Sequence, residues 1–229
     1  MAEAVAGRAG LRLAGAMTHF ATADDDPGFL AEQLAAFTPW AEAIKAAHPE
    51  LLVHAANSAA TLGIPEARLD LVRCGIGVYG MDPFGDDPAR HGLAPALELV
   101  SYLAEVKPIA PGESAGYGRR FVAAVPTWIG TVPIGYGDGV RRALTNDCDV
   151  LVDGRRVPVV GTVSMDNITV DLGPDPPAPG AEVVLLGARA GERVLAEEWA
   201  RRLATINYEI TCGIGPRVPR EHHRGGAPA

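Results

Sequence analysis

Two short blocks of the sequence place a tyrosine between glycines. One covers residues 114–120 and contains Tyr117, and the other covers residues 133–139 and contains Tyr136. Glycine lacks a side chain and permits positive φ, so its backbone can turn sharply and let a ligand approach closely. A phenol presented in this way can exchange a proton with a substrate. Its ordinary pKa is about 10, so work as a base near pH 7 requires neighbouring positive charge or hydrogen bonds. The alternative interpretation is two turns with half-buried aromatic corners.

Further polar residues occur in the first half of the chain, each just after an apolar run. Gly75-Ile76-Gly77, together with the Ser58 hydroxyl, could supply donors to a phosphate group. The alternative for each residue alone is a loop polar group or a tight turn. The residues that follow apolar runs in this manner are His19, Asn57, Ser58 and Arg73.

The apolar runs that precede these residues predict strands over 11–17, 51–55 and 69–73. Between the first two, apolar residues at helical spacing predict a helix over 27–48. Strand, loop, helix and strand at this pitch are typical of parallel α/β units. The polar residues would then lie at the carboxyl ends of parallel strands, the face that holds the active site in α/β barrels.

The composition changes over residues 83–95, where Pro, Gly, Asp and His accumulate, and we place a domain boundary there. Asp153-Gly154 predicts a type I′ hairpin turn. One helix is expected over 194–203. Short β-branched runs predict a small antiparallel sheet or barrel in this half, with strands over 97–106, 127–133, 150–152, 156–160, 168–172 and 183–186.

Composition bounds the class of protein. The chain has 229 residues, 48% of them apolar, which is enough to bury a sizeable core. Its formal charge of −8 and the lack of basic runs argue against binding nucleic acid. The three cysteines, Cys74, Cys148 and Cys212, are scattered without zinc-ligand spacing, so we expect a reducing cytoplasm and no metal site. No apolar stretch resembles a signal peptide or a membrane span, so no membrane association is expected.

Seven blocks of the sequence, taken in chain order, resemble the alanine racemase family, fold-type III enzymes that use pyridoxal phosphate. The resemblance runs from about residue 11 to about residue 220 and therefore covers nearly the whole chain. The blocks are residues 18–24, 54–60, 73–80, 114–120, 133–139, 161–166 and 205–209.

The resemblance implies an α/β plus β fold. Residues 1–93 would be the last strands of a TIM-like (β/α) barrel that binds pyridoxal 5′-phosphate, and residues 94–221 would be a mainly antiparallel C-terminal β domain. Residues 222–229 are expected to be a disordered tail. The implied activity is the interconversion of L-alanine and D-alanine, which supplies D-alanine for peptidoglycan. The implied assembly is a head-to-tail homodimer whose active sites are shared between subunits.

The resemblance also assigns roles to residues, and these are expectations. Tyr117 matches the catalytic tyrosine, which reaches into the active site of the other subunit. Tyr136 and Met165 match residues that narrow the substrate entrance from the same partner. Arg73 matches the arginine that faces the pyridine nitrogen of the cofactor. The remaining assignments are phosphate-binding positions at Ser58, Gly75 and Ile76, and histidines that connect the tyrosine to the arginine at His19 and His54.

The sequence departs from the family at the lysine that holds the cofactor as a Schiff base. Its only lysines are Lys45, in an expected helix, and Lys107, before a proline in a β segment. Neither resembles the family's lysine motif, and roughly five of the eight strands of a closed barrel are missing. We therefore expect the isolated chain to be inactive, with Met1 either a mis-assigned start inside a longer gene or the start of an interrupted one.

Two alternatives stay open at this point. The chain could be a non-catalytic binding or regulatory protein that keeps the fold and the phosphate-binding residues. It could also derive from a racemase of serine or of a broader range of amino acids. The pocket volume around Tyr136 and Met165 would decide that substrate preference.

Overall fold

The computed structural model describes residues 2–224 and 227–228, which form two compact units, Met1–Ala94 and Pro95–Ala229. Within the described part of the chain, no helix is both long enough and apolar enough to cross a membrane. The first unit contains the helices α1 (Ala2–Ala6), α2 (Pro27–Ala47) and α3 (Ser58–Gly63), the strands β1 (Gly15–Met17) and β2 (Leu52–His54), and the 3₁₀ turns η1 (Pro65–Ala67), η2 (Ile76–Tyr79) and η3 (Pro88–His91).

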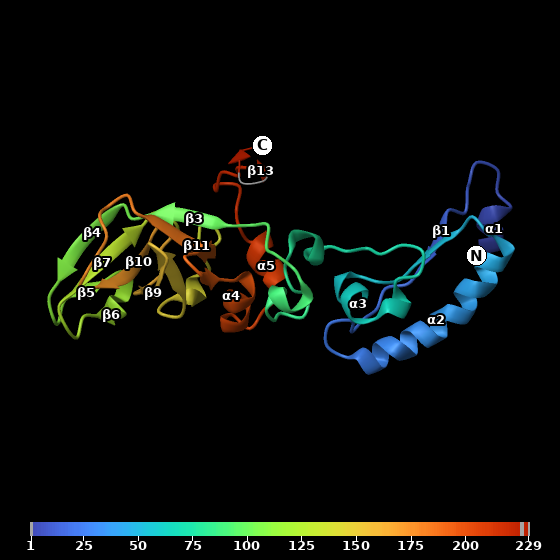
Figure 1. Ribbon diagram of the computed structural model, residues 1–229, viewed down its shortest axis with the longest axis horizontal. Helices are drawn as coiled ribbons and strands as arrows, with labels where there is room; N and C mark the ends of the chain where they lie inside the picture. Colours follow the sequence, from blue (N-terminus) through green and yellow to red (C-terminus); the bar gives the residue numbers. More distant parts are fainter. Residues whose placement is uncertain (1, 225–226, 229) are drawn as a thin grey trace. The chain divides into compact units, whose positions relative to one another are not determined.

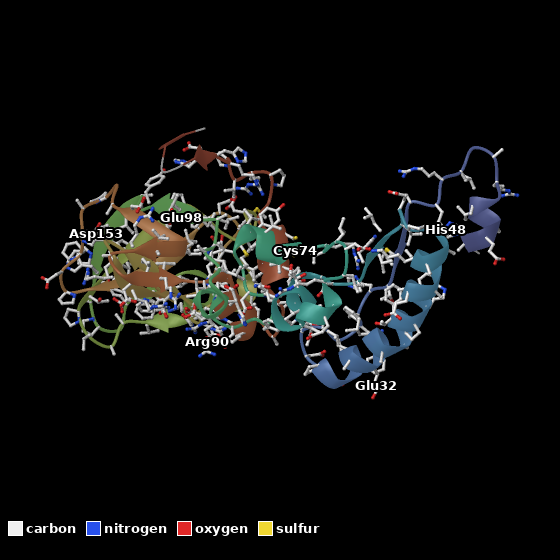
Figure 2. The ribbon with its side chains drawn as sticks, turned by 45° about the vertical axis from the view of Figure 1, so that its right-hand side comes forward. Glu32, His48, Cys74, Arg90, Glu98 and Asp153 are labelled. Carbon is white, nitrogen blue, oxygen red and sulfur yellow. The ribbon has the colours of Figure 1, made fainter. Side chains whose placement is uncertain are left out.

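The long helix α2 crosses from the end of β1 to the start of β2, and Figure 1 shows it as the main helix of the first unit. It begins at Asp26, whose carboxylate accepts a hydrogen bond from the Phe29 N–H at 3.0 Å, with Pro27 at the first helical position. The face of α2 that carries Glu32 is exposed to solvent, and Figure 2 shows the Glu32 side chain pointing outward. Its buried face includes Ala41 and Ile44. The predicted helix over 27–48 is confirmed to within one residue.

The strands β1 and β2 pair in parallel, with Ala16 opposite Val53. These two side chains point to the same face and are buried with Ala41 and Ile44 of α2. Strand, helix and parallel strand therefore form one βαβ unit, as the sequence predicts, although both strands are shorter than their apolar runs.

The third predicted strand, over 69–73, is wrong. This segment forms only an isolated parallel bridge between His54 and Leu71. Leu69 has a φ of 49°, which a continuous strand does not allow. The Asp70 carboxylate accepts the Val53 N–H at 2.9 Å, where a parallel ladder would use a backbone carbonyl. A side chain therefore replaces a ladder bond.

The second unit is built on an antiparallel sheet with the strand order β12-β11-β8-β9-β10-β7-β4, to which β3 adds beside β11 (Figure 1). Glu98, labelled in Figure 2, lies just before β3 and binds Arg189 of β11 at 2.8 Å. The strands of this sheet are β3 (Leu99–Tyr102), β4 (Glu105–Ile109), β7 (Thr127–Val132), β8 (Asp149–Val152), β9 (Arg155–Val160), β10 (Ile168–Gly173), β11 (Glu182–Arg189) and β12 (Glu192–Val194).

Smaller elements complete this unit. They are the hairpin β5 (Ser114–Ala115) and β6 (Phe121–Val122), the turns η4 (Tyr117–Arg119) and η5 (Arg142–Leu144), the helices α4 (Ala196–Arg202) and α5 (Asn207–Cys212), and the pair β13 (His223–Arg224) and β14 (Ala227–Pro228). The predicted disordered tail, 222–229, includes residues 225–226 and 229, which lie outside the described residues.

The predicted antiparallel β half is confirmed, with one run divided and one helix missed. Residues 97–106 contribute to two strands, β3 and β4, and α5 was not predicted. Asp153 and Gly154 join β8 to β9 with φ values of 49° and 72°, the two positive angles that a type I′ turn requires. The fold is thus a parallel βαβ unit with its following turns in unit 1 and a mainly antiparallel β domain in unit 2.

Candidate active site

The first group of candidate residues gathers around the Arg73 guanidinium in unit 1. Its Nη1 lies 2.7 Å from Nδ1 of His54, and its Nη2 lies 3.0 Å from Nδ1 of His19. Nη2 also donates to the carbonyl oxygens of Thr18 and Ala55, both at 3.0 Å. One cation therefore joins the ends of β1 and β2, which explains why polar residues follow both strands.

The arginine also fixes how the two histidines are protonated. A guanidinium has only donors, so Nδ1 of His19 and Nδ1 of His54 must both accept. Their ring protons then lie on Nε2, an assignment that follows from the partner rather than from an observed hydrogen. Within the described residues, Nε of Arg73 has no hydrogen-bond acceptor, so one further donor of this group is available.

A second cluster in unit 1 surrounds the Ser58 hydroxyl. Ser58 is the first residue of α3 and is buried. Its Oγ accepts the N–H groups of Gly75 at 3.0 Å and Gly77 at 3.2 Å. Ile76 begins η2, so its own N–H has no intrahelical acceptor. A Cβ added at Gly75 would meet no atom within 4 Å, so this side of the loop is open.

Pyridoxal phosphate fits part of this donor set. The Ser58 hydroxyl proton and the Ile76 N–H can bind a phosphate, and Nε of Arg73 can donate to a pyridine nitrogen. The covalent anchor does not fit this chain. Lys45 forms an ion pair with Asp70 on the outside of α2, and that ammonium, together with the Val53 N–H, lowers the pKa of Asp70. Lys107 is exposed on β4.

The third group, Tyr117, Tyr136 and Met165, lies in unit 2. All three side chains are exposed, at 76%, 43% and 50% respectively. Tyr117 begins η4, in the loop between β5 and β6, and its carbonyl oxygen accepts the Thr162 hydroxyl at 2.6 Å. Within this unit, therefore, the tyrosine backbone is anchored while its phenol extends into solvent.

The second tyrosine block packs directly on the segment that contains Met165. The Tyr136 N–H donates to Ser164 O and the Gly137 N–H donates to Met165 O, both at 2.9 Å. A Cβ added at Gly135 would lie 2.3 Å from Ser164 O, so no larger residue fits. Residues 161–167 therefore hold both tyrosine loops, the first through Thr162 and the second through the backbone of Ser164 and Met165.

Charged side chains fasten this arrangement in ways that the sequence did not predict. Nε of Arg217 lies 3.2 Å from Asp138, and its Nη2 donates to Asp166 at 2.5 Å. These two carboxylates, the hydrogen-bonded Asp166 first, raise the pKa of Arg217 above its ordinary value. The other carboxylate oxygen of Asp138 accepts the Gly135 N–H at 2.9 Å. No local pattern signals this link, because Arg217 is far from both carboxylates in sequence.

A parallel βαβ unit with an arginine–histidine cluster at its strand ends, followed by a mainly antiparallel β domain, agrees with what the sequence resemblance implies, the class of barrel-type pyridoxal phosphate enzymes. Residues 1–83 match the family described as "Alanine racemase, N-terminal domain", and residues 96–222 match "Alanine racemase, C-terminal domain". The chain belongs to the alanine racemase family.

Individual relatives agree with this assignment. The chain is 44% identical to the alanine racemase of Streptomyces coelicolor, over 92% of this chain and 55% of that protein. It is 42% identical to alanine racemase 1 of Bacillus subtilis, over 95% and 56%. The chain thus spans little more than half the length of these relatives.

Solved structures show the same fold. Alanine racemase from D-cycloserine-producing Streptomyces lavendulae superposes with a TM-score of 0.85 at 39% identity, covering 96% of this chain and 59% of that chain. Alanine racemase from Bacillus anthracis with bound L-Ala-P gives a TM-score of 0.84 at 38% identity, covering 95% and 57%.

Proposed function

We propose that this chain is the C-terminal portion of an alanine racemase that interconverts L-alanine and D-alanine with pyridoxal phosphate. The observation that carries the proposal is the Arg73 cluster, in which one guanidinium binds His54 and His19 at the ends of two parallel strands. Membership of the family supplies the reaction and the cofactor. The few, scattered cysteines favour action in the cytoplasm, and membership of the family implies that the D-alanine serves peptidoglycan.

In this proposal the residues of unit 1 hold the cofactor. Ser58 and the N–H of Ile76 bind its phosphate, beside the open loop at Gly75, and His54 orients Arg73. Pyridoxal phosphate, when bound, stabilises the negative charge that develops at the substrate's α-carbon. Arg73 remains protonated in a protein, so it hydrogen-bonds the pyridine nitrogen without giving up its proton. Because the pyridine nitrogen would then stay unprotonated, the cofactor would be a weaker electron sink, which favours simple proton exchange over side reactions.

The residues of unit 2 act on the substrate. Tyr117 moves the proton at the α-carbon on one face, and His19 connects that tyrosine to Arg73. Tyr136 and Met165 narrow the entrance. The exposure of these three side chains supports a role in the site of a partner subunit, in a homodimer with shared active sites. Because racemisation needs an acid/base group on each face, Tyr117 supplies only half of the chemistry.

The second group must come from outside this sequence, because neither of its lysines fits the role. Lys45 forms an ion pair with Asp70, and Lys107 is exposed on a strand of the β domain. A polypeptide that carries the N-terminal barrel strands and the cofactor lysine of a relative would provide it. The isolated chain with added pyridoxal phosphate should therefore show no racemisation of alanine.

The test is co-expression of the chain with such an N-terminal polypeptide, followed by an alanine racemisation assay of the purified complex. Restored turnover that disappears in Tyr117→Phe supports the proposal. Failure of the two polypeptides to associate contradicts it. Turnover by the isolated chain at rates typical of the family would contradict the requirement for a second polypeptide.

The lack of a suitable lysine also favours a second candidate, a non-catalytic protein that binds the cofactor or a similar phosphate ligand without reaction. In that case, pyridoxal phosphate would bind reversibly and Ser58→Ala would weaken it, while the co-expressed complex would stay inactive. A preference for serine or larger amino acids is tested in the same assay by comparing kcat/KM for alanine and serine.

A further inference from the structure

The loop that carries Tyr117 has an unusual backbone. Gly116 and Gly118 on either side of the tyrosine have φ values of 74° and 72°, in the left-handed region that favours glycine. The Tyr117 side chain is 76% exposed, so packing within its unit does little to fix the ring. The position of the phenol oxygen therefore depends on how firmly this backbone is held.

The Thr162 hydroxyl holds the loop at Tyr117 itself. It donates to the Tyr117 carbonyl oxygen at 2.6 Å, and Thr162 is only 8% exposed. The backbones also lie close together, because a Cβ added at Gly116 would come within 3.3 Å of the Thr162 nitrogen. This hydrogen bond is partly buried, so it restricts the loop more than a fully solvated one would.

The Asn146 amide holds the other end of the loop. Its Nδ2 donates to Arg120 O at 3.1 Å, and its Oδ1 accepts the Gly161 N–H at 2.5 Å. Asn146 has a φ of 56°, a left-handed conformation that asparagine adopts more readily than most residues. It thereby connects the end of the tyrosine loop to the residue that precedes Thr162.

We infer that Thr162 and Asn146 are positioning residues that set the location of the Tyr117 phenol. The inference rests on the proposed function, in which Tyr117 exchanges a proton with the substrate. Neither side chain needs to touch substrate or cofactor. They act through the backbone carbonyls of Tyr117 and Arg120, and a displacement of about 1 Å at a reacting group can cost about 100-fold in rate.

Amide hydrogen exchange of the purified chain tests whether Thr162 and Asn146 restrict the backbone of the tyrosine loop, without any need for activity. Thr162→Val keeps the shape and removes the donor, so we expect exchange of residues 116–120 to accelerate about 5- to 10-fold. Thr162→Ser restores the hydroxyl and should return exchange close to the original rate. Asn146→Asp keeps an acceptor for the Gly161 N–H but loses the donor to Arg120 O, and should accelerate exchange at the same loop.

Thr127→Val is the matched control. Thr127 is 7% exposed and its hydroxyl donates to Asp171 at 2.5 Å, so this variant loses a side-chain hydrogen bond at similar burial but on β7. Exchange of residues 116–120 should be unchanged in it. Unchanged exchange in Thr162→Val, or failure of Thr162→Ser to restore the original rate, overturns the positioning role.

Kinetics of the co-expressed complex separate this inference from the proposed function. Thr162→Val should lower kcat about tenfold or more while KM for alanine changes less than about twofold, and Thr162→Ser should recover most of kcat. If exchange responds as expected but Tyr117→Phe leaves turnover unchanged, the proposed function of Tyr117 is wrong, whereas the restriction of its loop by Thr162 and Asn146 is confirmed. If Tyr117→Phe abolishes turnover while Thr162→Val has full kcat, the positioning inference is wrong.

Discussion

At the scale of single residues, Arg73 links the ends of two parallel strands. It donates to two imidazoles and to the carbonyl oxygens of Thr18 and Ala55, which belong to the ends of two strands. Strand-end position and the resemblance predicted that Arg73, His19 and His54 belong together. The contacts to backbone carbonyls were not predictable, because they depend on how closely the two strand ends approach in space.

Arg73→Lys tests the structural part of this role. One ammonium cannot reach four acceptors on both sides of a planar fork, so we expect a loss of about 2 kcal/mol in the free energy of unfolding of unit 1. The measurement is a urea denaturation midpoint followed by circular dichroism. Arg68→Lys is the control, because Arg68 donates to a single carbonyl, that of Thr61, at 2.9 Å. Equal midpoints for the two variants would contradict the expectation.

The cysteines give a second prediction at this scale. Burial raises the pKa of Cys148 to about 12 from an ordinary value of 9.0, so its thiol stays neutral and unreactive in the folded state. Cys212 is exposed. Iodoacetamide at pH 8.5 should therefore label Cys212 within minutes and leave Cys148 unlabelled, as measured by peptide mass spectrometry.

The same shift makes stability depend on alkaline pH. Because the folded pKa of Cys148 lies above the unfolded value, its contribution is complete below pH 9 and is lost as the pH rises towards 12. Cys148→Ala should flatten that decline. Labelling of Cys148 at pH 8.5 as fast as that of Cys212 would show that the thiol is accessible and would contradict both expectations.

At the scale of elements, sequence patterns predicted the structure wherever local rules decide it. The helix over 27–48 has a capping aspartate, a proline at its first position and apolar residues at helical spacing, and it forms as α2. The Asp153-Gly154 turn follows from the positive φ that it requires. The segment 69–73 failed because the Asp70 side chain takes a backbone donor of β2, and α5 was missed because six residues carry little periodicity.

The link between Arg217 and the two carboxylates allows a prediction about an element that has no regular structure. Arg217→Gln removes the charge that holds Asp138 and Asp166 together, so the loop containing Tyr136 should loosen. Because Arg217 is half exposed, we expect only a two- to fivefold acceleration of amide exchange at Tyr136 and Gly137. Added salt should shrink the difference, since it screens exposed ion pairs.

Arg155→Gln is the control for this experiment. Arg155 lies on β9, is exposed and donates to the carbonyl oxygen of Asp175 at 3.3 Å. It removes the same charge without touching Asp138 or Asp166. A similar acceleration at Gly137 in both variants would mean that net charge, rather than the specific link, controls the loop.

At the scale of the whole molecule, the decisive feature is that the described residues cover the two parallel strands of unit 1 on one face only. Ala16 and Val53 pack on α2, and the register places Met17 and Leu52 on the opposite face. His54 lies on that face as well. Because Leu71 pairs with His54, the Leu71 side chain also lies there. Met17, Leu52 and Leu71 are 53%, 49% and 41% exposed. In a closed barrel this face is the packed interior.

This uncovered face predicts how the isolated chain should behave in solution. Adjacent exposed apolar side chains on a short parallel sheet favour self-association, so light scattering should increase with protein concentration. Leu52→Lys places a charge in the middle of the face and should reduce that association, whereas Val125→Lys, at a 65% exposed residue of unit 2, should not.

Co-expression with the N-terminal barrel polypeptide should suppress association of the unmodified chain. Leu52→Lys should then weaken assembly of the complex, because a charge in a barrel interior is costly. An isolated chain that stays monomeric at high concentration, with Leu52→Lys leaving the complex intact, would show that this face is not where the missing strands pack.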